Sequence, residues 1–308
     1  MSMEIPGTLE SLESRIRTLL PEQYRYCYED VQPVSMGSAG LKYDGEGKVA
    51  WNRIWGSFCD LAMAGGPPHK GNLLASATAV EVADDQERYE DVAAEICRGI
   101  ILATGLRGGP SEIPGWISLE CVAETSADWL VRAINMENVP AFWRGTKLYL
   151  PAGPTYRIEK EIKNVVTAVA KTAHYWLDHT RPAEQREVAE LLGRMADTAP
   201  LLQPAFPGSV VKPERLLAVK ARLSEKVQRA TGLRPTTRDY PGWCGFDGPD
   251  VETAIWMMRA LVASNVLSRR EEVTLFVPLD PENDPDGDRA ADMLIQVHSL
   301  AVTATAPR

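Results

Sequence analysis

The pentapeptide ATGLR at residues 103–107 recurs unchanged at residues 230–234, 127 positions further along the chain. The similarity extends outward from it, because residues 103–154 align with residues 230–281 without a gap. Of the 52 aligned positions, 17 are identical, whereas random pairing at average residue usage would give about three. The pattern indicates that this part of the chain arose by duplication.

A weaker echo precedes the two clear copies. A shift of 74 positions aligns three residues of the segment 35–82 with the first clear copy. The aligned pairs are Trp55 with Trp129, Gly71 with Gly145, and Leu74 with Leu148. Residues 35–82 are therefore a candidate for a degenerate first repeat, and the alternative of only two repeats stays open.

Both clear copies contain the same succession of local patterns. A helical stretch ends at the glycine of GLR, as helices often end just before a glycine, and a PGW turn follows. A second helical stretch comes next, and a short strand halted by proline closes the copy. The expected elements are helices over residues 88–102, 120–137, 213–229 and 249–264, and strands over residues 147–150 and 273–277. The repeated unit is therefore predicted to be α–α–β.

Apolar residues at three- and four-residue spacing predict further helices outside the copies. These cover residues 8–20, 158–179, 183–196 and 289–300. The expected fold class is α+β and helix-rich, with the duplicated α–α–β units packed together, because each unit is too small to bury both of its faces alone.

The predicted segments follow from these elements and should form one compact body. They are an N-terminal helix and lead-in (residues 1–34), the degenerate repeat (35–82), a repeat (83–157), a helical insert (158–207), a repeat (208–281) and a C-terminal tail (282–308).

Composition narrows the class of protein. The 308 residues carry a formal charge of -9, which repels a nucleic-acid backbone, and no basic run offsets it. Five cysteines at wide intervals lack the C-x-x-C spacing of zinc ribbons. No apolar stretch approaches the ~20 residues of a membrane helix, and the N-terminus does not resemble a signal peptide. An acidic, soluble, cytoplasmic protein is expected, with no nucleic-acid or membrane partner.

The most unusual segment is CDLAMAGGPPHKG at residues 59–71. Its glycines would let a ligand approach the main chain, while His69 could act as general acid or base and Lys70 could bind an anion. Cys59 and Asp60 at its start are assigned to substrate binding. The alternative is a helix C-cap followed by a rigid turn, with both basic side chains in solvent.

Four polar residues fall on one stripe of the predicted central helix: Asn164, Thr167, Lys171 and His174. If the stripe lines a cavity, desolvation would shift the pKa of Lys171 or His174 and suit either residue to proton transfer. Asn164 would then bind substrate. The alternative is that the stripe is the ordinary solvent face of an amphipathic helix.

A cationic residue follows the helix at a similar place in each unit: Lys70, Arg144 and Arg270. If the units pack about a pseudo-symmetry axis, these side chains could converge on one carboxylate or phosphate. The alternative is that each compensates the negative end of its helix.

The sequence is compatible with two different functions. The first is an enzyme acting on a small anionic metabolite between the repeats, using His69, Lys70, Lys171 and His174. The second is a non-catalytic ligand-binding or assembly protein, whose repeated surfaces recognise a partner or further copies of this chain. No dinucleotide, P-loop, zincin or hydrolase fingerprint is present. The reaction type and cofactor stay open, and no metal site is assigned.

Overall fold

The computed structural model describes residues 8–20, 41–53, 72–205, 207 and 211–305. Its contacts divide the chain into two compact units. The central unit comprises residues Asp30–Pro182. The terminal unit joins Met1–Glu29 to Ala183–Arg308, so that it is formed by two separate stretches of the sequence. Cys59, Asp60, His69 and Lys70, with half of the candidate first repeat, lie outside the described residues.

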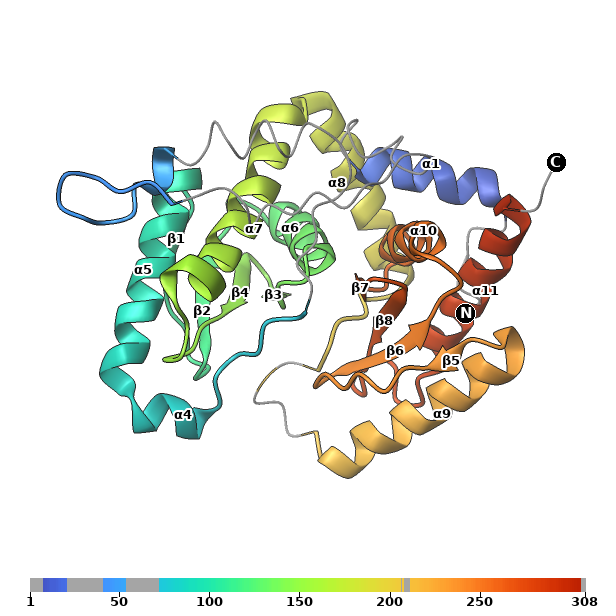
Figure 1. The fold of residues 1–308 in the computed structure, drawn as a ribbon. Coiled ribbons are helices and arrows are strands. Elements are labelled where there is room, and N and C mark those ends of the chain that lie inside the picture. The colour runs from blue at the N-terminus through green and yellow to red at the C-terminus, as the bar shows by residue number, and fades with distance from the viewer. Residues whose placement is uncertain (1–7, 21–40, 54–71, 206, 208–210, 306–308) are drawn as a thin grey trace. The chain divides into compact units, whose positions relative to one another are not determined.

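The central unit is built from helices around one antiparallel sheet, in which the strand order is β1-β2-β4-β3 (Figure 1). Its elements are η2 (Trp51–Arg53), α4 (Ala79–Asp84), α5 (Gln86–Thr104), β1 (Arg107–Pro110), β2 (Trp116–Glu120), α6 (Glu124–Met136), β3 (Phe142–Arg144), β4 (Lys147–Pro151), η3 (Ile158–Ile162), α7 (Lys163–His174) and η4 (Tyr175–His179). The last three form one continuous helical run, with π-type turns at both ends.

The terminal unit has a sheet of its own, with strand order β5-β6-β8-β7. Its elements are α1 (Leu9–Leu19), α8 (Pro182–Thr198), α9 (Pro213–Thr231), β5 (Arg234–Pro235), β6 (Trp243–Asp247), α10 (Val251–Val262), β7 (Arg269–Glu271), β8 (Thr274–Pro278) and α11 (Asp288–Thr305). The described residues thus hold nine α-helices and two four-stranded antiparallel sheets, which confirms the mixed α+β class.

The two sheets pair equivalent residues. Trp116 lies opposite Pro151 in one sheet, and Trp243, 127 positions later, lies opposite Pro278 in the other. The turns also correspond, because left-handed backbone occurs at Gly105 and Gly232, Gly115 and Gly242, Asn138 and Asn265, and Gly145 and Glu272. Each of these pairs is separated by the spacing of the repeat in the sequence.

Each sheet is formed by one segment of the chain, from α5 to β4 in the central unit and from α9 to β8 in the terminal unit. A glycine ends the first helix of each of these sheet-bearing segments, as the sequence predicts. Gly105 caps α5 and Gly232 caps α9, both at φ 76°. This left-handed conformation is strained for a residue with a Cβ. The backbone N–H of each glycine donates to the carbonyl four residues earlier, in Ile101 and Gln228 respectively.

The α–α–β prediction is too short, because each segment is observed as a helix, two strands, a helix and two strands. A third helix follows in both. In the central unit α7 packs on α5 and α6, and in the terminal unit α11 packs on α9 and α10 (Figure 1). The predicted insert and tail therefore supply the helices that complete the two cores.

No helix within the described ranges combines the length and the apolar character needed to cross a membrane.

Candidate functional site

The two arginines proposed as anion ligands differ in their surroundings, and both lie in strands rather than in the expected turns. Arg144 is exposed at the end of β3 in the central unit. Arg270 belongs to β7 of the terminal unit, is only 1% exposed, and donates from Nη1 to the Glu272 carbonyl at 2.9 Å. Burial, followed by the nearby positive charge of Arg259, lowers the pKa of Arg270 to about 10. The different surroundings of Arg144 and Arg270 do not indicate a shared role in binding an anion.

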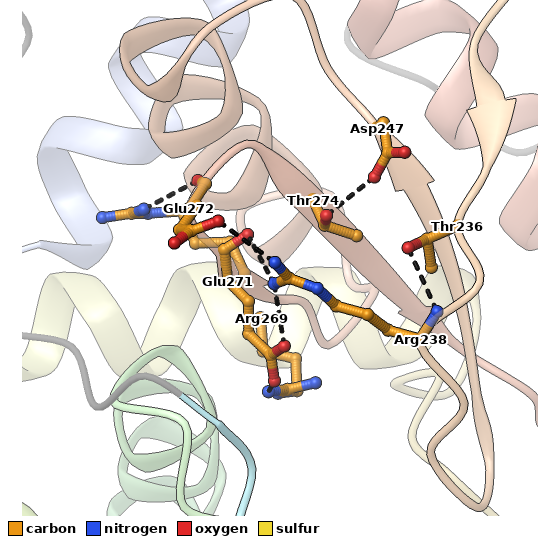
Figure 2. Close-up of polar contacts among 8 residues, drawn as sticks. Thr236, Arg238, Asp247, Arg269, Glu271, Glu272 and Thr274 are labelled. Carbon is orange, nitrogen blue, oxygen red and sulfur yellow. Dashed lines mark hydrogen bonds and ion pairs between the residues drawn. The ribbon is translucent and has the colours of Figure 1, made fainter.

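The neighbours of Arg270 form a charge network on the β7–β8 hairpin, shown in Figure 2. Arg238 bonds to two carboxylates, with Nη1 3.0 Å from Glu271 and Nη2 3.1 Å from Glu272. Arg269 donates to the other oxygen of Glu271 at 2.5 Å, and its guanidinium stacks over the Tyr240 ring. The network fixes the segment before β6 against the hairpin, which is a structural role.

The polar stripe of α7 lies largely inside the central unit. Asn164 is half-buried, whereas Thr167 and Lys171 are buried, with Lys171 only 1% exposed. The Lys171 Nζ donates to Glu137 at the end of α6, which forms a buried ion pair. The stripe is therefore not an ordinary solvent face, and Lys171 is held by a carboxylate.

His174 ends the stripe in a hydrogen-bonded chain of ionisable groups. Its Nδ1 lies 2.5 Å from Oδ2 of Asp178, and its Nε2 lies 2.9 Å from Nε2 of His179. The Asp178 side chain is 61% exposed, while that of His174 is 16% exposed. The chain thus leads from an exposed carboxylate through a partly buried imidazole to a second imidazole.

The π-turn at the end of the central helix creates this chain. In an α-helix His174 and Asp178, four residues apart, share a face, but a residue five positions on turns away from it. The η4 segment instead follows i→i+5 hydrogen bonding, and Thr180 closes it by donating from Oγ1 to the Tyr175 carbonyl at 2.8 Å. His179 is thereby brought back against His174.

A hollow of about 300 Å³ lies beside the chain. The described residues that line it are Leu102, Ala103, Thr104, Gly105, His174, Leu177 and Asp178. The C-terminal end of α5 forms one wall and the π-turn forms the other. Because the two leucines are about half exposed, the hollow joins an apolar surface to the His174–Asp178 pair.

The neighbours of each histidine decide which of its ring nitrogens can accept a proton. Asp178 holds a proton on His174 Nδ1, which leaves Nε2 as the basic nitrogen of that ring. Burial, and then the proximity of His174, lower the pKa of His179, although Asp178 opposes the shift. His179 therefore stays neutral more readily than a free histidine.

Sequence reasoning singled out His174 but missed Asp178 and His179. The H-x-x-x-D spacing on a predicted helix does signal the His174–Asp178 contact. No comparable signal finds His179, because its position depends on the π-turn. Within the described ranges, no group of three His, Cys, Asp or Glu residues is placed to hold a metal ion.

Comparison of the chain with protein-family models, curated proteins and solved structures finds no match.

Proposed function

We propose that this protein is an enzyme in which His174 is the general acid–base catalyst and Asp178 orients it. The observation that carries the proposal is the chain from Asp178 through His174 to His179 beside the hollow at the end of α5. A carboxylate that fixes the tautomer of a histidine is a recurrent arrangement for proton transfer.

The proton step follows from the geometry. His179 Nε2 lies 2.9 Å from His174 Nε2 and stands where a substrate hydroxyl or amino group would donate. When substrate displaces it, the proton of that group moves to His174 Nε2, and Asp178 stabilises the resulting imidazolium. The reverse transfer returns the proton to the leaving group or product.

Lys171, assigned to catalysis from the sequence, has a positioning role in this proposal. Its ion pair with Glu137 joins α7 to α6 one turn before His174. The small anionic substrate expected from the sequence remains a prediction. The described residues that line the hollow include neither lysine nor arginine, so neither residue type supports the binding of an anion there. Cytoplasmic location and association with further copies of the chain likewise stay predictions.

A panel of model reactions tests catalysis directly. Hydrolysis of nitrophenyl esters, and isomerisation and dehydration of small hydroxy compounds, would be assayed for the wild-type protein, His174→Gln and His298→Gln. His298 lies on α11 of the terminal unit, so its variant controls for general loss of histidine. Loss of about 10²–10⁴-fold in turnover is expected for His174→Gln alone.

Equal turnover in the two variants would contradict a catalytic role for His174. An inactive wild-type protein throughout the panel would instead favour the alternative predicted from sequence, a non-catalytic ligand-binding or assembly protein.

We also infer that the two sheet-bearing segments descend from one duplicated ancestor. The sequence repeat supports this inference, as do the shared strand order and the left-handed turns spaced by 127 positions. The third helices, α7 and α11, extend the inferred repeat beyond the aligned sequence. Only the first segment carries the His174 site, since Ala301 stands 127 positions after it.

A further inference from the structure

A second pocket, of about 350 Å³, lies wholly within the terminal unit. Helices α1, α8 and α11 supply its walls, and the residues just after α10 complete it. The described polar residues that line it are Ser11, Ser14, Arg15, Thr18, Arg194, Thr198, Ser264, Asn265 and Arg289. Neither the sequence motifs nor the proposed catalytic site account for this concentration of donors.

The charge of the pocket is opposite to that of the whole chain. Acidic residues outnumber basic ones 42 to 33 in the sequence, yet the described residues lining the pocket include three arginines and neither aspartate nor glutamate. The arginines come from three different helices: Arg15 from α1, Arg194 from α8 and Arg289 from α11. Three guanidinium groups in a lining that includes neither aspartate nor glutamate favour the binding of an anion.

Ser264 supplies an independent sign of a missing ligand. Its residue is only 4% exposed, and within the described part of the chain its Oγ has no hydrogen-bond partner. A buried hydroxyl without a partner loses its hydration and gains nothing in return, at a cost of about 1–3 kcal/mol. A ligand oxygen in the pocket would accept the hydrogen bond that this hydroxyl can donate.

The neighbouring donors are already held in place by the protein. Asn265 Nδ2 donates to the Ala199 carbonyl at 2.6 Å, and Arg289 Nη2 donates to the Pro200 carbonyl at 2.5 Å. Both bonds satisfy carbonyls at the C-terminal end of α8. Arg289 is thereby fixed at one nitrogen, while its buried Nε has no partner within the described ranges. The pocket is therefore partly preorganised.

Arg289 also remains a cation despite its burial. Desolvation lowers its pKa, but the charges of Asp284 and Asp280 oppose that shift, and guanidinium groups stay protonated at neutral pH. Asp284, four residues before α11, accepts from the backbone N–H groups of Arg289 and Ala290 in the first turn of that helix. Its carboxylate supports the arginine without entering the lining of the pocket.

We infer that this pocket binds a tetrahedral oxyanion, either inorganic phosphate or the phosphate group of a small ester. Donors that approach from α1, α8 and α11 suit an anion whose oxygens diverge in several directions. A carboxylate presents two coplanar oxygens, which a single guanidinium fork satisfies. The inference does not depend on the His174 proposal, because the two sites belong to different units.

Isothermal titration of the full chain at constant ionic strength tests the ligand class. The probes are inorganic phosphate, sulfate, glycerol 2-phosphate and acetate. Saturable binding of phosphate and sulfate is expected, with acetate at least about tenfold weaker. Tighter binding of glycerol 2-phosphate than of inorganic phosphate would identify an ester as the ligand, and the reverse order would identify the free anion.

Two arginines of α8 provide a matched pair of variants. Arg194 lines the pocket, whereas Arg186 is exposed on the same helix and does not line it. Arg194→Gln should weaken phosphate binding about tenfold or more, the effect of losing one charged hydrogen bond. Arg186→Gln should leave the affinity within about twofold, since exposed charges contribute little.

Ser264→Ala separates ligand binding from folding. Its affinity for phosphate should fall about threefold to tenfold, while the Tm of the ligand-free protein should stay equal or rise, because the hydroxyl has no partner to lose. Absence of saturable phosphate binding, acetate binding as tight as phosphate binding, or equal losses in Arg194→Gln and Arg186→Gln would each overturn the inference.

Discussion

Lys171 and Glu137 place two opposite charges inside the central unit, where they form a buried ion pair. Removing one partner of a buried ion pair leaves the remaining charge desolvated, which typically costs 3–5 kcal/mol. Replacing both partners by apolar residues of similar size is often neutral. Stability is therefore expected to fall more when one charge is removed than when both are replaced.

Lys171→Met should lower the free energy of unfolding by about 3–5 kcal/mol, measured by urea denaturation. The double variant Lys171→Met with Glu137→Leu should recover most of that loss, because no charge is left unpaired. A double variant as unstable as the single one would show that the pair is not the source of the effect.

The two histidines with lowered pKa predict the sign of the response to acid. Burial lowers the pKa of His298 below 6.5, and burial together with His174 lowers that of His179. The unfolded chain therefore binds protons more readily than the folded chain as the pH falls through 6.5, and stability decreases. This contribution is complete above pH 6.5 and is lost toward lower pH.

His298→Gln should reduce the loss of stability of the terminal unit in acid. The measurement is the free energy of unfolding at pH 7.5 and at pH 5.5. The wild-type protein should lose more stability over this interval than the variant. An identical loss in both proteins would contradict the assignment to His298.

At the scale of the elements, two turns require glycine for different physical reasons. Gly105 and Gly115 both have positive φ, at 76° and 81°. A Cβ on Gly105 would meet open space, whereas one on Gly115 would fall on the carbonyl oxygen of Ala77. The first glycine is needed only for its backbone conformation, and the second also for the close approach of another segment.

Gly105→Ala should destabilise the central unit by about 1–2 kcal/mol, the cost of a left-handed conformation for a residue with a Cβ. Gly115→Ala should cost about twice as much or more, because backbone atoms must also move. Thermal unfolding of the two variants tests the order, and an equal loss would contradict the close approach to Ala77.

The sequence predicts the long helices of this fold better than its strands. Periodic apolar residues and glycine caps place α5, α9 and α10 within a few residues of their observed bounds, and the predicted helix 158–179 coincides with the run from η3 through α7 to η4. The strands β1 and β5 carry no such pattern, since they read RGGP and RP and are mostly exposed. Pairing with β2 and β6 creates them, so tertiary structure and not local preference decides their conformation.

The sequence likewise predicts some residues of the candidate site and misses others. Regular helical spacing groups Lys171 and His174 on one stripe, and it also puts Asp178 within reach of His174. It cannot place His179, which depends on the π-turn, or the arginine pocket, whose walls come from helices far apart in sequence. Contacts of this kind arise from packing, which a single periodic pattern does not encode.

At the scale of the whole molecule, the terminal unit is discontinuous in sequence. Helix α1 packs against α10, although more than 200 residues separate the two helices, and its side chains Leu12, Ile16 and Leu19 are buried. The sequence predicts this helix as part of an N-terminal segment (residues 1–34), but it does not indicate which helices α1 packs against. Long-range closure of this kind carries an entropic cost that the buried apolar surface must offset.

Leu12→Ala should destabilise the terminal unit by about 2–5 kcal/mol, as large-to-small core substitutions do. Arg17→Ala on the exposed face of the same helix should change stability by less than about 0.5 kcal/mol. Hydrogen exchange should show reduced protection in α10 for the first variant. A loss confined to α5 and α7 would contradict the membership of α1 in the terminal unit.

The most direct test of the proposed catalytic site is the protonation state of His174 by nitrogen-15 NMR of the full chain at pH 8. The geometry predicts a proton on Nδ1 and a basic Nε2, and Asp178→Asn should abolish this preference. His298 provides the internal reference. An Nε2-protonated His174 that is unaffected by Asp178→Asn would contradict the proposed acid–base function.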